Sequence, residues 1–321
     1  MLFALGATSK EIQQGYDTNV SYQRSPEPLK DSIVDDMHKP VRSKTYLGKE
    51  QYYHDFLEVL DEYVFARDER ADDLLARLHT GFLHPTVHTG FGLAQACVHE
   101  KWINHCKDDR KTIVQLLEEV KKDEELSNAA HWEDSNKIRD GIMKRALEKM
   151  VAITSKPNLA LQTAELKPCA VYFTAAAQRP PHQVKFDFYY MHCVTSSIFF
   201  SNFLSPANTF LAPAAKRRLL EWKVWNNIVM YASRHSPALL LSEITEYTPK
   251  EDSDWDKIIL RVNKTEDDGH ASKAISALAN GQKSCQPYED KPGFVIKGDA
   301  WRKVGHIHMA IDSVEAGELW V

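Results

Sequence analysis

Residues 186–204 read FDFYYMHCVTSSIFFSNFL, a nearly continuous apolar run. The run is too long for an ordinary strand, and it lacks the alternation of polar and apolar residues that a half-buried strand shows. Pro180 and Pro181 precede it, and proline cannot continue a helix because it lacks the amide donor and restricts the preceding residue. We therefore predict a buried helix that begins after this proline pair.

Amphipathic patterns with helical spacing recur on both sides of the apolar run. Apolar residues repeat three and four positions apart within residues 56–78, 112–126, 137–153 and 216–231. A short helix is predicted at residues 272–278, ended by Asn280-Gly281, and the first residues are predicted to end a helix at Gly6. Strand-like stretches are few. The sequence thus predicts a mainly α, single multi-helix globular domain over residues 1–321, with few or no strands.

The composition argues against several classes of partner. The chain has 40 basic and 45 acidic residues, mixed along its length, so no basic block indicates nucleic acid or an anionic membrane. Its five cysteines form no C-x-x-C pair, which favours a reducing compartment. No uninterrupted run approaches the roughly 20 apolar residues that span a bilayer, and the apolar start is too short for a signal peptide. We expect a cytoplasmic protein without nucleic-acid or membrane partners.

Three distant stretches each carry a histidine that could ligate a metal ion. His192 lies inside the apolar run, where a buried imidazole needs partners for both ring nitrogens. Those partners could be a hydroxyl or carbonyl group, or a metal ion on one nitrogen and an orienting acceptor on the other. Taken alone, a histidine in such a run is more often an ordinary core residue.

The other two stretches bring pairs of candidate ligands onto one helix face. His84 and His88 are four positions apart, and His270 and Lys273 are three apart. A lysine ammonium has no lone pair, so Lys273 could ligate a metal only when deprotonated or converted by carbon dioxide into a carbamate. A structural histidine pair and a solvated surface lysine are the alternatives.

Other motifs in the sequence give weaker evidence about function. Gly90-Phe91-Gly92 resembles the start of a dinucleotide fingerprint, but no strand precedes it and the third glycine is absent. His306 and His308 could lie on one strand face, although the surrounding pattern also fits a helix and structural packing. The sequence has no G-x-S-x-G elbow, so a serine hydrolase has little support.

With these stretches placed in order, the chain resembles the questin oxidase family, fungal oxygenases that act on anthraquinones and related polyketides. Five segments carry the resemblance, and they span nearly the whole chain. They are residues 16–24 (YDTNVSYQR), 81–92 (GFLHPTVHTGFG), 187–197 (DFYYMHCVTSS), 268–273 (DGHASK) and 301–313.

The resemblance implies an α-helical oxygenase of aromatic polyketides in secondary metabolism, which uses dioxygen. Members are described as Baeyer–Villiger-type monooxygenases, usually with NADPH as reductant, and a related ring-opening dioxygenase holds non-heme iron with histidines and a carboxylated lysine. Carried over by motif, the Fe(II) ligands and catalytic residues here would be His192, His270 and Lys273, together with His84 or His88.

Four aromatic residues near these ligands could line a flat apolar substrate pocket or belong to the core: Phe82, Phe91, Tyr189 and Tyr190. Members of the family generally begin with an Asn-His-x-x-His helix before the segment that matches residues 1–7. We therefore expect one ligand of the family's set to be missing from this chain, through truncation, a reorganised site or loss of turnover.

Two other classes of function compete with an iron oxygenase. A hydrolase could use zinc and a carbamylated lysine to activate water, but we expect such an enzyme to show several strands with ligands at their ends. A folded scaffold or remnant of the family with an incomplete site is the second alternative. Metal content discriminates between an oxygenase and a scaffold.

Overall fold

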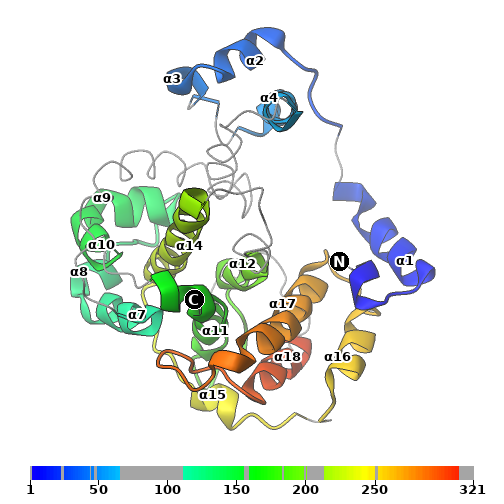
Figure 1. Ribbon diagram of the computed structural model, residues 1–321, viewed down its shortest axis with the longest axis vertical. Helices are drawn as coiled ribbons and strands as arrows, with labels where there is room; N and C mark the ends of the chain where they lie inside the picture. The colour runs from blue at the N-terminus through cyan, green and yellow to red at the C-terminus, as the bar shows by residue number, and fades with distance from the viewer. Residues whose placement is uncertain are drawn as a thin grey trace.

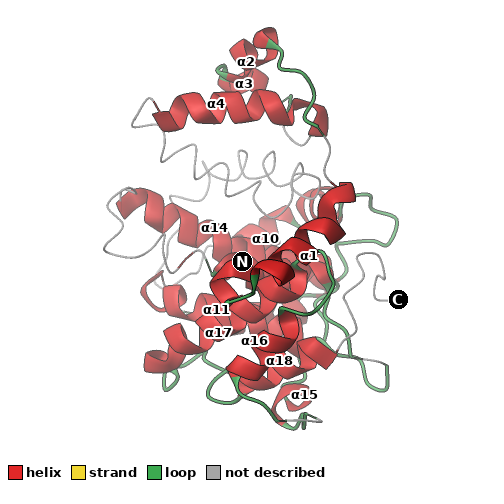
Figure 2. Cartoon of the chain, turned by 90° about the vertical axis from the view of Figure 1, so that its right-hand side faces the viewer, coloured by secondary structure: helices red, strands yellow, loops and turns green. Residues whose placement is uncertain are grey.

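The computed structural model describes residues 2–22, 25–43, 45–46, 49–65, 111–154, 159–182, 184–198, 200, 213–249 and 252–310. Within these ranges the chain is built from helices joined by turns and loops, and it contains no strand (Figure 1). Figure 2 shows the same helical arrangement from the side. The predicted mainly α fold is confirmed.

The N-terminal elements form two groups. The first group lies beside α16 (Trp255–Val262) and α17 (His270–Cys285) (Figure 1), and Asn19 donates a hydrogen bond to the Asp267 carbonyl oxygen there. Its elements are the 3-10 turn η1 (Leu2–Leu5), α1 (Ser9–Asn19) and the 3-10 turn η2 (Val20–Tyr22). The second group surrounds its own apolar cluster and contains α2 (Asp31–Met37), α3 (Pro40–Ser43), the 3-10 turn η3 (Glu50–Tyr52) and α4 (Tyr53–Phe65). The predicted helix at residues 56–78 is described only as far as Phe65.

In the next block, both predicted helices are divided into shorter pieces. Its elements are α7 (Ile113–Lys122), α8 (Glu124–Ser127), the π-helix η4 (Lys137–Ile142), α9 (Met143–Arg145) and α10 (Leu147–Thr154). Thr112 and Gln115 form a capping box at the start of α7. A Cβ on Gly141 would lie 2.9 Å from the Cα of Ala130, so η4 passes close to the preceding loop. The helix predicted over residues 112–126 is interrupted at Asp123, whose backbone is extended, and the helix predicted over residues 137–153 is three short pieces.

The centre of the fold is α11 (Leu159–Ala176), which contacts α7, α12, α14 and α17. The apolar run forms α12 (Phe188–Ser197), and the amphipathic pattern at residues 216–231 forms α14 (Pro213–Ser233). The remaining elements are α15 (Ser242–Thr245), α16 (Trp255–Val262), α17 (His270–Cys285), the 3-10 turn η5 (Gln286–Tyr288) and α18 (Ala300–Ala310). Together they surround one large apolar core.

The predicted end of a helix at Asn280-Gly281 is wrong, because α17 continues to Cys285. Gly281 lies where α17 meets α18, and a Cβ at this position would lie 2.3 Å from a ring carbon of the fully buried Trp301. The glycine allows two helices to approach closely, rather than ending one of them. In contrast, Gly6 follows η1 with φ of 76°, which confirms the predicted helix end there.

Across the described ranges, no helix combines the length and the apolar character needed to cross a membrane.

Glu165 is a carboxyl group buried in the centre of the fold, on α11. One of its oxygens accepts the Ile113 N–H at 2.9 Å, at the first turn of α7, and burial raises its pKa to about 7. The native state therefore holds this proton up to about pH 7, whereas the unfolded chain releases it near the ordinary glutamate pKa of 4.5. The free energy of unfolding should fall as the pH rises from about 4.5 to about 7, and the loss persists above that range.

Glu165→Gln should remove this pH dependence, because glutamine keeps an acceptor for Ile113 but does not ionise. We expect the variant to be more stable than the parent by about 2 kcal/mol at pH 8 and similar to it at pH 4.5, in urea denaturation. Glu118→Gln, on the exposed face of α7, is the matched control. If the free energy of unfolding of the parent and of Glu165→Gln changed with pH in parallel, the raised pKa of Glu165 would be contradicted.

Candidate functional site

His192 is positioned by the first turns of α12. Asp187 caps this helix, and its Oδ1 accepts the N–H groups of Tyr189 and Tyr190 at 2.9 and 3.1 Å. One turn into the helix, His192 Nδ1 lies 2.7 Å from the carbonyl oxygen of Phe188. A carbonyl oxygen only accepts hydrogen bonds, so Nδ1 carries the proton and Nε2 presents its lone pair.

His270 is positioned by the turn that begins α17. Gly269 has φ of 87°, a left-handed conformation that suits glycine, and Asp267 accepts the Gly269 and Ala271 N–H groups. The Asp268 carboxylate contacts His270 Nδ1 and holds the proton on that nitrogen. The contact with His270 also lowers the pKa of Asp268 against the opposing effect of burial. In its neutral form, His270 therefore presents the Nε2 lone pair as well.

The two Nε2 atoms lie 3.4 Å apart. When both Nδ1 atoms carry protons, two lone pairs face each other at this distance, and a shared cation stabilises such a pair. Two nitrogens about 2.1 Å from one ion, at octahedral or tetrahedral angles, are about 3.0–3.4 Å apart. The imidazoles therefore fit one metal ion, with Phe188 O and Asp268 as the orienting groups outside them.

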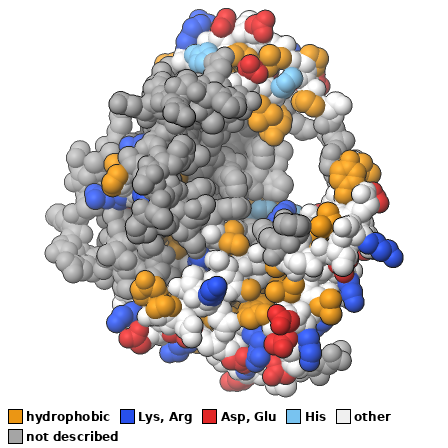
Figure 3. Space-filling view, turned by 45° about the vertical axis from the view of Figure 1, so that its right-hand side comes forward, with side chains coloured by type: hydrophobic (Ala, Val, Ile, Leu, Met, Phe, Trp, Pro, Cys, Tyr) orange, Lys and Arg blue, Asp and Glu red, His pale blue; other side chains and the backbone are white. Residues whose placement is uncertain are grey.

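Phe188 forms one side of this pair. Its ring centroid lies 4.4 Å from that of His192 and 5.1 Å from that of His270. The space-filling view of Figure 3 shows histidine side chains, in pale blue, among the described atoms of this face of the molecule. His192 and His270 are half-buried rather than enclosed.

Lys273 lies one turn along α17 from the start of the helix, and its side chain is exposed. Its Nζ folds back over the helix start, 3.9 Å from the place of a Cβ on Gly269, and its charge helps to lower the pKa of Asp268. The predicted ligands His84 and His88 and the predicted pocket residues Phe82 and Phe91 lie outside the described residues. The histidine and lysine ligand set stays a prediction.

The two predicted pocket tyrosines have different surroundings. Tyr190 is fully buried, and its hydroxyl group donates to the Tyr231 carbonyl oxygen at 3.1 Å. Tyr189 is half-buried, and the Arg234 guanidinium lies 4.1 Å from its ring centroid. Tyr190 is thus a core residue on the opposite side of α12 from His192, and Phe188 is the aromatic residue beside the histidine pair.

His308 is a further candidate that the sequence pattern left undecided. His306 and His308 lie on α18, so the strand alternative is wrong. The buried His306 ring contacts Ser253, whereas neither ring nitrogen of His308 has a hydrogen-bond partner among the described residues. Burial, with a smaller contribution from His270, lowers the pKa of His308 to about 4, so its imidazole is neutral at pH 7.

The described residues alone do not complete a metal site. In this part of the chain, no three histidine, cysteine or carboxylate side chains converge on one point. His192 and His270 are the two that meet, and His308 is a neighbour of His270 rather than a third member of the set.

Lys223, on α14, supports the helix that carries His192. Its side chain is fully buried, and Nζ donates to the Cys193 carbonyl oxygen, Ser196 Oγ and Asn227 Oδ1 at 2.7–2.9 Å. Ser196 Oγ in turn donates to the His192 carbonyl oxygen at 2.6 Å. Burial lowers the pKa of Lys223 to about 8. Sequence periodicity placed this lysine in a helix but gave no sign of its burial.

The sequence matches the Questin oxidase-like family over residues 1–278. A Baeyer-Villiger monooxygenase of a Cryptosporiopsis species is 31% identical, and the match covers 95% of this chain and 80% of that protein. A Baeyer-Villiger oxidase of Pestalotiopsis fici is also 31% identical, with 95% and 79% of the two chains covered. The questin oxidase of Aspergillus terreus is 28% identical, with 97% and 80% covered.

Proposed function

Because the chain belongs to the questin oxidase-like family, we propose that it is an iron-dependent oxygenase of an aromatic, anthraquinone-type polyketide. The relatives are named as oxidases and monooxygenases, and the chain is an oxidoreductase of the same family. The proposed reaction inserts oxygen beside a quinone or aryl ketone carbonyl group, and the ring then opens. Two of the three relatives described above carry the name Baeyer-Villiger, which describes an insertion of this kind.

The observation that carries the iron proposal is the 3.4 Å separation of the His192 and His270 Nε2 atoms, with both Nδ1 atoms held by acceptors. Neutral imidazoles suit Fe(II), alongside oxygen ligands. Lys273, as a carbamate, and His84 or His88 would complete the ligand set. Bound Fe(II) would supply the activation of dioxygen.

The chain's own residues have separate tasks in this proposal. Phe188 O and Asp268 keep the protons on Nδ1 of the two histidines, so that in the neutral imidazoles both Nε2 atoms carry lone pairs. Phe188 excludes water from one side of the imidazoles. NADPH is the proposed reductant, since insertion of one oxygen atom requires two electrons to reduce the other atom to water. Insertion of both atoms requires no external reductant.

Labelled dioxygen tests the proposal. The protein is loaded with Fe(II) and its metal content is measured by elemental analysis. It is then incubated with an anthraquinone under ¹⁸O₂, with and without NADPH, and products are examined by mass spectrometry. We expect near-stoichiometric iron and a product that carries one labelled atom when NADPH is present, or two without it. Stoichiometric zinc with label only from H₂¹⁸O would indicate the hydrolase, and absence of both metal and product would indicate a scaffold.

A further inference from the structure

A cavity of about 330 Å³ lies where the loop after α8 meets the ends of α11, α12 and α14. Tyr190 lines it from α12. At 100° per residue, Tyr190 is about 200° around the helix from both Phe188 and His192. The cavity therefore lies on the opposite side of α12 from the histidine pair, and the proposed oxygenase site does not use it.

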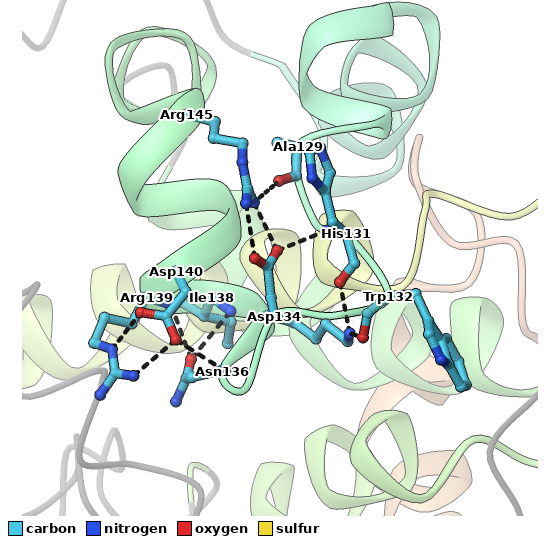
Figure 4. Close-up of polar contacts among 10 residues, drawn as sticks. Ala129, His131, Trp132, Asp134, Asn136, Ile138, Arg139, Asp140 and Arg145 are labelled. Atoms are coloured by element: carbon cyan, nitrogen blue, oxygen red, sulfur yellow. Dashed lines mark hydrogen bonds and ion pairs between the residues drawn. The ribbon is translucent and has the colours of Figure 1, made fainter.

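One wall of the cavity is an exposed indole ring held by a fixed loop. Trp132 is 59% exposed, although it is a large apolar side chain. Figure 4 shows the loop that carries it: Arg145 binds both oxygens of Asp134 and the Ala129 carbonyl oxygen. Lys137 donates to the Trp132 carbonyl oxygen, and its Nζ lies 5.4 Å from the indole centroid. An exposed tryptophan in a fixed position is a surface on which an aromatic ring can stack.

The lining of the cavity carries an excess of positive charge. Lys137, Arg179 and Arg234 line it, and Asp187 is the acidic residue among the described lining residues. The Asp187 carboxylate is already engaged, because Oδ1 caps α12 and Oδ2 lies 3.3 Å from Arg234 Nε. Lys137 donates to neutral carbonyl oxygens, and the exposed Arg179 lies at the rim. Among the described residues, no carboxylate forms an ion pair with Lys137 or Arg179, so both cations remain to balance a negative charge in the cavity.

The far side of the cavity is a strained turn. His235 and Ser236 follow α14 with φ of 60° and 44°, a left-handed conformation that is uncommon outside glycine. The Ser236 N–H donates to the Tyr231 carbonyl oxygen, and the Tyr231 hydroxyl group donates to the Pro237 carbonyl oxygen at 2.7 Å, which holds the turn closed. Strained backbone of this kind is concentrated at ligand sites.

We propose that this cavity is a second ligand site, which takes a small planar aromatic anion such as an aryl carboxylate or phenolate. The ring stacks on Trp132 against the mainly apolar walls, and the negative charge faces Arg179 and Lys137. A volume near the lower end of the range of about 300–1,000 Å³ for small-molecule sites fits one or two fused rings. The inference does not depend on the proposed oxygenase activity.

Calorimetric titration with 2-naphthoate, and with 2-naphthamide as its neutral analogue of similar shape, tests the proposal. We expect the naphthoate to bind at least about tenfold more tightly than the amide, as for a charge-assisted hydrogen bond. Arg179→Glu should weaken naphthoate binding by about tenfold or more and change amide binding little. Trp132→Ala should weaken the binding of both. Arg261→Glu, the same change at an exposed arginine of α16, is the control and should leave both affinities unchanged.

Equal affinity for the two probes, or unchanged naphthoate binding in Arg179→Glu, would overturn the proposal. His192→Ala separates the two sites, since it should leave naphthoate binding intact. Loss of naphthoate binding in His192→Ala but not in Arg179→Glu would assign the ligand to the histidine pair instead. Iron content is measured independently, so a failed oxygenase proposal and a failed cavity proposal give different results.

Discussion

Replacing His192 by alanine is expected to abolish iron retention and to lower product formation by at least about 100-fold, while the helical far-UV spectrum persists. The variant removes one of the two facing Nε2 atoms but leaves the cap of α12 and the Phe188 carbonyl oxygen in place. His192 is half-buried, so its removal opens little of the core. Lys273→Ala is expected to lose iron as well, because the carbamate oxygens are lost with the amine.

Elemental analysis after Fe(II) loading and desalting measures the effect, with ¹⁸O incorporation as the second readout. His182→Ala, at an exposed histidine before α12, is the matched control and should retain iron at the parent's level. Iron in His192→Ala equal to that in His182→Ala would remove the histidine pair from the metal site. If Lys273→Ala retains iron and His192→Ala does not, the histidine pair remains assigned to the metal site and Lys273 is not a ligand.

Lys223→Ala is expected to lower the free energy of unfolding by about 4 kcal/mol, the largest stability effect that we predict for one side chain. The substitution leaves a cavity inside the core and deprives Ser196 Oγ and Asn227 Oδ1 of their buried donor. Both effects act beneath α12, so His192 should lose part of its support. Urea denaturation followed by far-UV circular dichroism measures the change.

Lys223→Met separates the two causes, because methionine fills most of the space but donates no hydrogen bond. Methionine also relieves the burial of an ammonium group, so this variant should lose only about 1–2 kcal/mol. If the free energy of unfolding of Lys223→Ala stays within about 1 kcal/mol of the parent's, Lys223 does not stabilise the core. If Lys223→Met is as unstable as Lys223→Ala, the hydrogen bonds rather than the volume explain the effect.

The fold class was predictable because local pattern and burial agree over the helices that the sequence analysis identified, although the central helix α11 was not among them. The apolar run at residues 186–204 contains α12, and α7 begins directly after Thr112, where the amphipathic pattern of residues 112–126 begins. The prediction failed where a contact distant in the chain decides the local structure. Gly281 resembles a helix terminator in sequence, but α17 continues through it because the Trp301 ring occupies the place of a side chain.

The candidate site was predictable only in part. His192 and His270 were singled out by their setting and by family resemblance, and the structure brings their rings together. Phe188 and Lys223 were missed because one is an ordinary apolar residue in a run of apolar residues, and the other follows the spacing of a surface lysine. His308 was undecided between strand and helix, and only the helix α18 places it beside His270.

The two carboxylate oxygens of Asp187 bind groups on opposite sides of α12, and this arrangement predicts how mutations at Asp187 behave genetically. Oδ1 fixes the first turn, which presents His192 one turn later, and Oδ2 restrains the guanidinium of Arg234 beside the cavity. A substitution at this position acts on both sides at once, so its phenotype is pleiotropic. By reciprocity, any free energy that couples the two sides through Asp187 acts equally in both directions. Suppressor mutations of an Asp187 defect should accordingly fall into two groups, one on each side of the helix.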